Sequence, residues 1–234
     1  MENQEKDRIA ANLERVRERI ARAAQRAGRR PEEVRLVAVT KNVDVPRIQA
    51  ALAAGVTEIG ENRVQEARLK RPALGSAVRW HLIGTLQTNK VKAALQLFDL
   101  IHSLDRWSLA EELARRATAA GRVVEVLVEV NVSGEATKAG LAPGEVLPFL
   151  ERVHGLAGLR VRGLMTVAPA TERAEEVRPF FRTLARLRAA AVREGWTEVT
   201  ELSMGMSGDF EVAVEEGATL VRLGTAIFGP RNQG

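Results

Sequence analysis

Lysine is scarce in this chain, and Lys41 stands where an amine could act as a nucleophile. Only six of the 35 Lys and Arg residues are lysines, so arginine supplies most of the positive charge. Arginine stays protonated in proteins, whereas a lysine amine can lose its proton and attack a carbonyl carbon. Lys41 follows the apolar run 36–39 and Thr40. Dry surroundings there would lower its pKa and favour a Schiff base with an aldehyde; the alternative is an exposed loop lysine.

Two glycine-containing segments late in the chain could bind an anion. The first, 203–209, contains Ser207, and the second, 224–229, begins with Gly224 and Thr225. Free backbone N–H groups together with hydroxyl groups favour a phosphate. The same residue types also suit ordinary turns and helix caps, so each segment alone is a weak signal. Taken together, the two segments predict a phosphate site.

Arg222 alternates with apolar neighbours in the run 220–223, which predicts a charged side chain inside the fold. A buried charge needs a partner, and that partner is either a carboxylate or a bound group. Glu129, like Asp105, is interpreted as a structural ion-pair partner. The three histidines have no metal-ligand spacing, so no metal site is expected. Of these, His81 and His102 are interpreted as interior histidines whose polar atoms have partners.

A helix is expected at the start of the chain, at about 3–28. Four apolar residues recur there at spacings of four, three and four, which places them on one stripe of a helix. These residues are Ile9, Leu13, Val16 and Ile20. Gly28 and the proline that follows it end the pattern.

After this helix, eight β-rich runs alternate with helical or short connecting segments. The β-rich runs cover 34–39, 57–60, 79–83, 99–104, 124–130, 161–165, 200–204 and 220–223. The clearest helical patterns cover 46–54, 108–120, 146–153, 174–194 and 210–216. Such alternation predicts a parallel sheet, and eight repeats favour a closed (β/α)8 TIM barrel over an open doubly wound sheet. The glycine-rich motif of a doubly wound dinucleotide fold is missing after the first run.

No linker or change of composition marks a second domain, so residues 1–234 are expected to form a single α/β barrel domain. In such barrels the functional residues lie at the carboxyl ends of the strands, and phosphates often bind after strands seven and eight. Lys41 would then follow the first strand and Asn62 the second. The segments with Ser207 and Thr225 would follow strands seven and eight.

Composition argues against several function classes. The absence of cysteine excludes disulfides and thiolate chemistry and fits a reducing compartment. No apolar run reaches the roughly 18 residues of a membrane span, and the N-terminus has no apolar signal region. The net charge is +5, but arginines alternate with glutamates and no basic patch includes aromatic residues. A solvated surface is therefore favoured over nucleic-acid binding.

Six motifs in order connect these observations to a known family. They are VAVTK (37–41), GENRVQE (60–66), WHLIG with LQTNK (80–84 and 86–90), GLMT (163–166), LSMGMS (202–207) and VRLGTAIFG (221–229). In these motifs the chain resembles the pyridoxal phosphate homeostasis proteins (the YggS/PROSC family) over nearly its whole length. The resemblance implies the barrel of the alanine racemase N-terminal domain, known as PLP fold type III, with pyridoxal 5′-phosphate (PLP) as cofactor.

The resemblance also assigns residues to the cofactor. It implies that Lys41 forms the Schiff base with PLP and that Arg222 faces the pyridine nitrogen. The other implied contacts are Asn62 beside the cofactor and Ser207, Gly224 and Thr225 at its phosphate. Lys90 and Lys138 lie in matching stretches and are secondary candidates. Many relatives have a second lysine two positions after the Schiff-base lysine, where this chain has Val43, so a hand-off role for that lysine is in doubt here.

The same chemistry bears on whether the protein is an enzyme. PLP catalyses as an electron sink, which a carboxylate opposite its ring nitrogen strengthens, whereas an arginine there leaves the nitrogen neutral. The resembling racemases use a lysine and a tyrosine, the latter from a second domain. This chain has no tyrosine and stops after the eighth strand. We therefore expect a non-catalytic PLP carrier. The alternatives are a PLP-dependent amino-acid racemase or related enzyme, and a phosphosugar-type barrel enzyme without PLP.

The remaining expectations concern surroundings and partners. The resemblance suggests a monomer in the cytoplasm that acts in intracellular PLP homeostasis. Besides PLP, apo-enzymes that depend on PLP are candidate partners. Neither nucleic acid nor a membrane is expected to bind.

Overall fold

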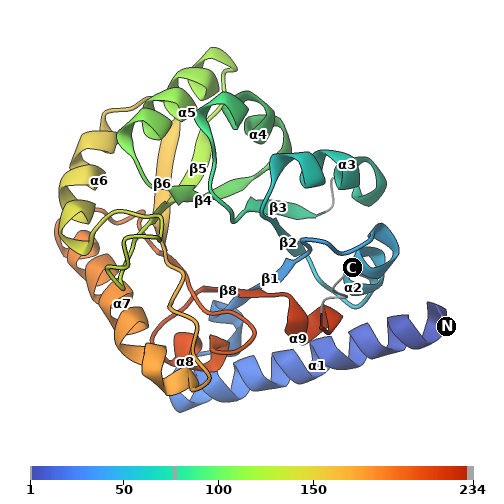
Figure 1. Cartoon of the computed structure of the whole chain (residues 1–234). Coiled ribbons are helices and arrows are strands. Elements are labelled where there is room, and N and C mark those ends of the chain that lie inside the picture. Colours follow the sequence, from blue (N-terminus) through green and yellow to red (C-terminus); the bar gives the residue numbers. More distant parts are fainter. Residues whose placement is uncertain (1, 76–77, 231–234) are drawn as a thin grey trace.

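A computed structural model of the chain describes residues 2–75 and 78–230 and contains the predicted closed barrel. Its eight parallel strands follow one another in chain order around the barrel, and β8 pairs with β1 (Figure 1). The strands are β1 (Arg35–Val39), β2 (Glu58–Glu61), β3 (Arg79–Leu82), β4 (Leu100–Leu104), β5 (Val124–Glu129), β6 (Leu159–Met165), β7 (Glu201–Ser203) and β8 (Leu220–Leu223). Each predicted β-rich run is a strand, so the predicted fold class is confirmed.

Helices cover the outside of the barrel. They are α1 (Glu2–Arg26), α2 (Val45–Ala53), α3 (Val64–Leu74), α4 (Val91–Leu97), α5 (Trp107–Ala119), α6 (Val146–His154), α7 (Arg178–Arg193), α8 (Phe210–Glu215) and α9 (Thr225–Phe228). Short 3₁₀ turns lie at Pro31–Glu33, Thr88–Lys90, Pro143–Glu145 and Ala174–Val177. The helix expected at 174–194 therefore starts as a 3₁₀ turn. Helices α3, α4 and α9 were not predicted, because α3 contains Pro72 and α4 and α9 have only seven and four residues.

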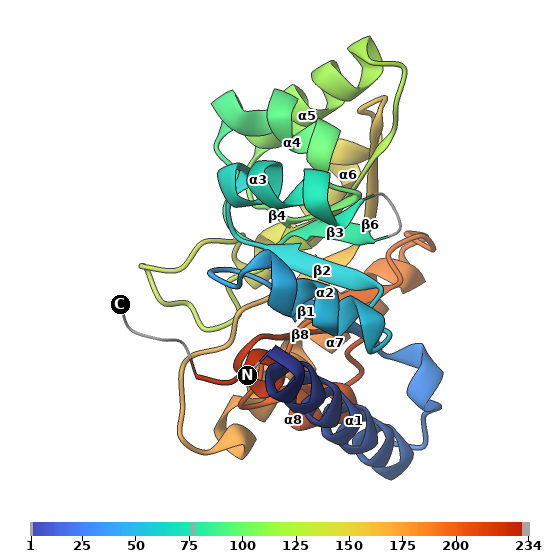
Figure 2. The same cartoon turned by 90° about the vertical axis from the view of Figure 1, so that its right-hand side faces the viewer.

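Helix α1 lies across the outside of the barrel beside β8 and β1 (Figures 1 and 2). Its predicted apolar stripe is buried, and it packs against α2, α8 and α9. The amide of Asn12 donates to the carbonyl of Ile227 at 2.8 Å, which joins α1 to the segment after β8. Gly28 follows α1 with φ +67°, a left-handed conformation that favours glycine. The N-terminal helix thus supports the place where the barrel closes.

The inside of the barrel contains an apolar cluster and several polar groups. The apolar cluster consists of Val37, Leu100, Leu127, Met165 and Leu220. Charged side chains at the starts of the strands form ion pairs across the barrel. Arg35 on β1 reaches Glu201 on β7 at 2.7 Å and Glu58 on β2 at 3.3 Å. Because β1 and β7 are not neighbours, the first of these pairs crosses the barrel interior.

In the described part of the chain, none of the helices combines the length and apolar character that crossing a bilayer would require.

The packing of α1 predicts the effect of truncating its stripe. Leu13 is fully buried, whereas the next residue, Glu14, is exposed. We expect Leu13→Ala to lower the free energy of unfolding by about 3 kcal/mol, because it leaves a cavity under α1. Urea unfolding followed by circular dichroism would measure this loss. Glu14→Ala serves as the control, and equal stabilities of the two variants would show that α1 is not part of the cooperative core.

Candidate functional site

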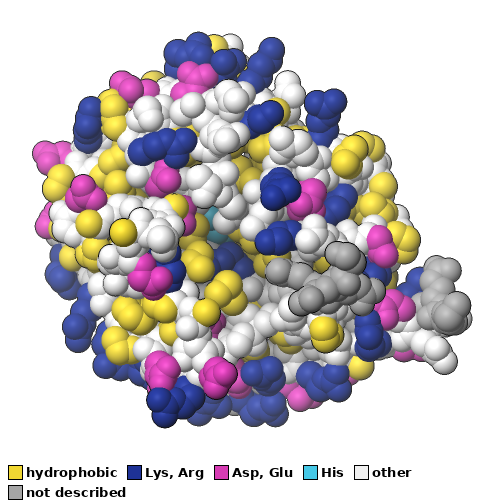
Figure 3. Space-filling view, in the orientation of Figure 1, with side chains coloured by type: hydrophobic (Ala, Val, Ile, Leu, Met, Phe, Trp, Pro, Cys, Tyr) yellow, Lys and Arg dark blue, Asp and Glu magenta, His cyan; other side chains and the backbone are white. Residues whose placement is uncertain are grey.

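A cavity of about 810 Å³ at the carboxyl ends of the strands brings three predicted residues together. They are Lys41 after β1, Asn62 after β2 and Lys90 before α4. Most of the other lining residues also come from the segments after β2 and β3. Figure 3 shows this end of the barrel, with histidine, Lys and Arg side chains visible in a hollow at its centre.

The backbone before Lys41 is held by a buried polar cluster. The amine of Lys70 on α3 donates to the carbonyl of Thr40 at 2.7 Å and to Oε1 of Glu61 at 2.8 Å. The hydroxyl of Thr40 donates to the same carboxylate oxygen at 2.6 Å. Burial raises the pKa of Glu61, while Lys70 and Thr40 oppose the increase. Lys70 is therefore a structural lysine that fixes the end of β1.

The turn that carries Lys41 is short and strained. Asn42 has φ +58°, and its N–H donates to Oε2 of Glu66 at 3.1 Å. Left-handed backbone is uncommon outside glycine, although asparagine tolerates it better than most residues. The next residue, Val43, is buried in the core, so the position at which the resemblance implies a second lysine is a packing position here. Lys41 itself is half-buried and makes no hydrogen bond or ion pair with any described residue.

Other cations around the cavity are also free. Arg63 and Lys90 line it, and their side chains have no hydrogen-bond or ion-pair partner among residues 2–75 and 78–230. The cavity's one lining carboxylate, Glu66, is already paired with Lys70 at 3.2 Å. The wall also depends on Gly84, because a Cβ there would lie 2.4 Å from the carbonyl oxygen of Asn62. The cavity therefore carries a surplus of positive charge.

The segments after β7 and β8 meet, as the predicted phosphate site requires. The hydroxyl oxygen of Ser207 accepts the N–H of Gly224 at 3.3 Å and that of Ala226 at 3.1 Å. Because the oxygen accepts both bonds, the Ser207 proton is left for a ligand. The Thr225 hydroxyl is exposed and has no partner among the described residues. A Cβ on Gly224 would lie 3.5 Å from the carbonyl oxygen of Val39, so these segments border the end of β1, two residues before Lys41.

Arg222 is buried inside the barrel, and its hydrogen-bond acceptors are neutral. It donates to the hydroxyl of Ser203 at 2.6 Å and to the carbonyl of Thr166 at 2.8 Å. No carboxylate of the described residues lies within ion-pair distance of it, so the structure does not contain the buried salt bridge considered above. Burial lowers the pKa of Arg222 to about 10, which leaves the guanidinium charged at neutral pH.

The interior histidines have internal partners, in agreement with the sequence analysis. Nδ1 of His81 lies 2.9 Å from Nε2 of His102, and Nδ1 of His102 lies 2.9 Å from the hydroxyl of Ser203. The link through Ser203 to Arg222 was not predicted. No periodicity could reveal it, because β4 and β7 face each other only after the barrel has closed. Among the described residues, no group of three metal-ligating side chains is positioned to hold a metal ion.

Glu129 differs from its predicted role. Asp105 forms an ion pair, with Arg106, but Glu129 has no ion pair with any residue that the structure describes. Its side chain is buried near the carboxyl end of β5. Burial and the charge of Asp105 raise the pKa of Glu129 to about 7, against an opposite effect of Arg222. The interpretation of Glu129 as an ion-pair partner was therefore wrong.

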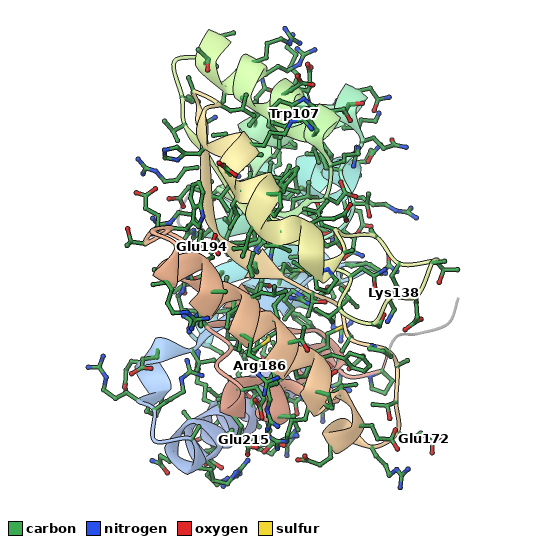
Figure 4. All side chains as sticks on the ribbon, turned by 90° about the vertical axis from the view of Figure 1, so that its left-hand side faces the viewer. Trp107, Lys138, Glu172, Arg186, Glu194 and Glu215 are labelled. Carbon is green, nitrogen blue, oxygen red and sulfur yellow. The ribbon has the colours of Figure 1, made fainter. Side chains whose placement is uncertain are left out.

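Lys138 is one of the predicted residues outside the cavity lining, as are Ser207, Arg222, Gly224 and Thr225. It belongs to the connection between β5 and α6, which projects beyond the carboxyl ends of the strands (Figure 4). Its amine is 2.9 Å from Oε1 of Glu135 in the same segment. Lys138 is not among the residues that line the cavity with Lys41.

Together these residues fit a ligand that has both a carbonyl and an anionic group. Lys41 offers an amine without a competing partner. Ser207 and Thr225 offer hydroxyl donors on adjoining segments, and Arg222 offers a buried charge that no neighbouring carboxylate contacts. A metal ion has no comparable donor set among the described residues.

Comparison with known proteins gives consistent matches over almost the whole chain. Residues 11–232 match the family described as alanine racemase, N-terminal domain. The pyridoxal phosphate homeostasis protein of Aquifex aeolicus is 48% identical over 220 residues, which cover 94% of this chain and 96% of the relative.

Two solved structures are also similar. A protein of unknown function from Bifidobacterium adolescentis has a TM-score of 0.93 and 40% identity, with 97% of each chain covered. PipY of Synechococcus elongatus, solved with PLP bound, has a TM-score of 0.82 and 38% identity, with 94% of this chain and 100% of PipY covered.

The raised pKa of Glu129 predicts how stability depends on pH. The folded protein keeps a proton on Glu129 up to about pH 7, whereas an unfolded chain releases it near pH 4.3. Because the folded state binds more protons in this window, stability falls as the pH rises through it. Glu129→Gln removes this effect. Between about pH 5 and about pH 8, the wild-type protein should lose about 2 kcal/mol relative to the variant.

Urea unfolding of the ligand-free proteins at the two pH values would measure this difference. Glu172→Gln is the control, because Glu172 is an exposed carboxylate. Parallel stability curves for wild type and Glu129→Gln would contradict the prediction.

Proposed function

Because the chain belongs to the family of pyridoxal phosphate homeostasis proteins, we propose that it holds PLP covalently through Lys41 and keeps the cofactor available inside the cell. The observation that carries this proposal is the free amine of Lys41 in a cavity at the carboxyl ends of the strands. Its neighbour Lys70 is bound to Thr40 and Glu61 and cannot take the same role. The relative PipY, solved with PLP bound, supports the choice of ligand.

We assign the phosphate of PLP to the segments after β7 and β8. Ser207 and Thr225 would donate hydroxyl protons, and Gly224 lets the backbone approach closely. The segment with Gly224 borders Val39, two residues before Lys41, so one ligand can reach both groups. Asn62 lines the cavity with Lys41 and would lie beside the pyridine ring. Lys90 remains a secondary candidate, while Lys138 is outside the cavity.

Arg222 is assigned to the pyridine nitrogen, and this assignment favours a carrier over an enzyme. Bound PLP supplies an electron sink for reactions of amino acids, and protonation of its ring nitrogen strengthens that sink. Arg222 cannot accept a proton, so it would hold the ring nitrogen as a hydrogen-bond acceptor. Its guanidinium is fixed by Ser203 and Thr166 and is not free to move away. Such a site is suited to binding PLP and poorly suited to activating it.

An amino-acid racemase is the second candidate, supported by the match to the alanine racemase N-terminal domain. Racemisation by two bases needs a second proton carrier on the face of the substrate opposite Lys41. The chain has no tyrosine. Among the residues that line the cavity, Glu66 is paired with Lys70, and Arg63 stays protonated. Lys90 is left as the one free amine besides Lys41 in that lining, so the carrier remains the better explanation.

The proposal includes the cellular setting. A PLP carrier acts where PLP-dependent apo-enzymes are made, so we place the protein in the cytoplasm as a monomer with those apo-enzymes as candidate recipients.

The covalent role of Lys41 can be tested by replacing it. Lys41→Ala should abolish the visible absorbance of protein-bound PLP and the fixation of PLP to the protein by borohydride, because the amine that bonds the aldehyde is gone. Lys92→Ala is the matched control, since Lys92 is an exposed lysine on α4 outside the cavity. Borohydride fixation that survives in Lys41→Ala would disprove the assignment.

Exchange of the amino-acid α-proton distinguishes the carrier from the racemase. In deuterated water with PLP-loaded protein, we expect no α-deuterium incorporation into alanine or other amino acids above the rate with free PLP, because an arginine at the ring nitrogen leaves the electron sink of PLP weak. Proton NMR of the amino acids would measure the exchange. A turnover that depends on Lys41 and Lys90 would instead support the racemase.

A further inference from the structure

A line of polar contacts crosses the barrel interior from β8 to β2. It runs from Arg222 on β8 to Ser203 on β7, then to His102 on β4 and His81 on β3. At its far end, Nε2 of His81 lies 2.9 Å from Oε2 of Glu58, the first residue of β2. The two histidines and Ser203 are completely buried. We call these five residues the interior polar chain.

The types of the groups fix the direction of every proton in this chain. The Arg222 guanidinium has no acceptor, so the Ser203 oxygen must accept from it, and the Ser203 proton is free to go to Nδ1 of His102. From the other end, an ionised Glu58 can only accept, so His81 carries its proton on Nε2. A neutral His81 then accepts at Nδ1 from Nε2–H of His102. Both ends of the interior polar chain thus require the same proton order, and every link has one donor and one acceptor.

Charge and burial support this proton order. Burial is the largest effect on both histidines and lowers the pKa of His81 and His102, which keeps them neutral. Burial raises the pKa of Glu58, but the contact with His81 and the charges of Arg35 and Arg79 outweigh it, and the net lowering of this pKa keeps Glu58 ionised. Asp209 and Glu129 act on Arg222 only through space, without ion-pair contact. Hydrogen bonds therefore connect the Arg222 charge to His81 through Ser203 and His102, and the close contact of 2.9 Å between Nε2 of His81 and Oε2 of Glu58 completes the line.

We propose that Ser203, His102 and His81 are positioning residues that hold Arg222, through one fixed order of protons ending at Glu58, in the orientation that receives the PLP ring. This inference rests on the proposed function, because it takes Arg222 as the group that faces the ring. Hydrogen-bonded groups in a low-dielectric interior polarise one another, so a change at one end reaches the other. Binding of PLP beside Arg222 should therefore change the electronic environment of His102 and His81.

The proton order can be measured directly by nitrogen-15 NMR of histidine side chains. The chain has three histidines, and the third, His154, lies on α6 against Trp196, outside the interior polar chain. Without PLP, His81 and His102 should both show a protonated Nε2 and an unprotonated Nδ1. A protonated Nδ1 on either residue would overturn the proposal. Addition of PLP should shift the signals of His102 and leave those of His154 unchanged.

A pair of serine variants tests the link to Arg222. Ser203→Ala removes the hydroxyl that accepts from Arg222, whereas Ser103→Ala removes a buried hydroxyl that has no partner among the described residues. Only Ser203→Ala loses a hydrogen bond to a charged group, the Arg222 guanidinium. The affinity of this variant for PLP should therefore fall about tenfold or more. The absorbance maximum of bound PLP should also shift in Ser203→Ala and stay unchanged in Ser103→Ala.

The outcomes separate this inference from the proposed function. If the wild-type protein does not bind PLP, the proposed function fails, and the histidine tautomers still decide whether the proton order exists. If the wild type binds PLP but Ser203→Ala binds it with unchanged affinity and absorbance, the proposed function stands and the positioning role fails. Thermal unfolding of the PLP-free variants checks that both remain folded. Should Ser203→Ala fail to fold, the PLP-dependent shift of His102 in the wild type decides alone.

Discussion

The site depends on a buried arginine whose hydrogen-bond acceptors are all uncharged. Arg222 donates to a serine hydroxyl and a backbone carbonyl, and no described carboxylate touches it. A guanidinium taken out of water without a partner charge is costly, and a folded protein tolerates it only when its geometry is firmly held. Closure of the barrel provides that geometry, because β4, β7 and β8 contribute side chains to one interior. The same arrangement leaves N–H groups of the Arg222 guanidinium that can donate to a ligand.

Unlike Arg222, Lys41 is positioned by hydrogen bonds to the neighbouring residues and not by contacts of its own side chain. Lys70, Glu61 and Glu66 bind the residues on either side of it and leave the Lys41 amine without a partner. The contrast between two lysines in neighbouring segments separates their roles. The amine of Lys70 is engaged in structural hydrogen bonds, whereas the amine of Lys41 remains available to react with a ligand. Burial of Val43 in the core also holds the turn that contains Lys41 and Asn42.

Much of this arrangement follows from the sequence, and the remainder depends on closure. The alternating β-rich and helical runs predict the barrel, and the rule that functional residues lie at the carboxyl ends of strands indicates Lys41, Asn62 and the segments of Ser207 and Thr225. Helices α3, α4 and α9 were not predicted, because α3 contains a proline and α4 and α9 are short. The bond between His102 and Ser203 joins residues 101 positions apart across the barrel. No local pattern reports such a pairing, nor the missing partner of Glu129.

The attachment of α1 has a consequence for the order in which the molecule assembles. Residues at the start of the chain pack on α8 and α9, and Asn12 binds a carbonyl at position 227. During synthesis on the ribosome, the first helix can pack on α2 early, but the surface formed by α8 and α9 is absent until almost the last segment has emerged. Contacts between such distant parts of a chain form slowly. The segment with Gly224 and Thr225, to which we assign the phosphate of PLP, thus folds late. PLP can therefore bind only once the barrel is complete.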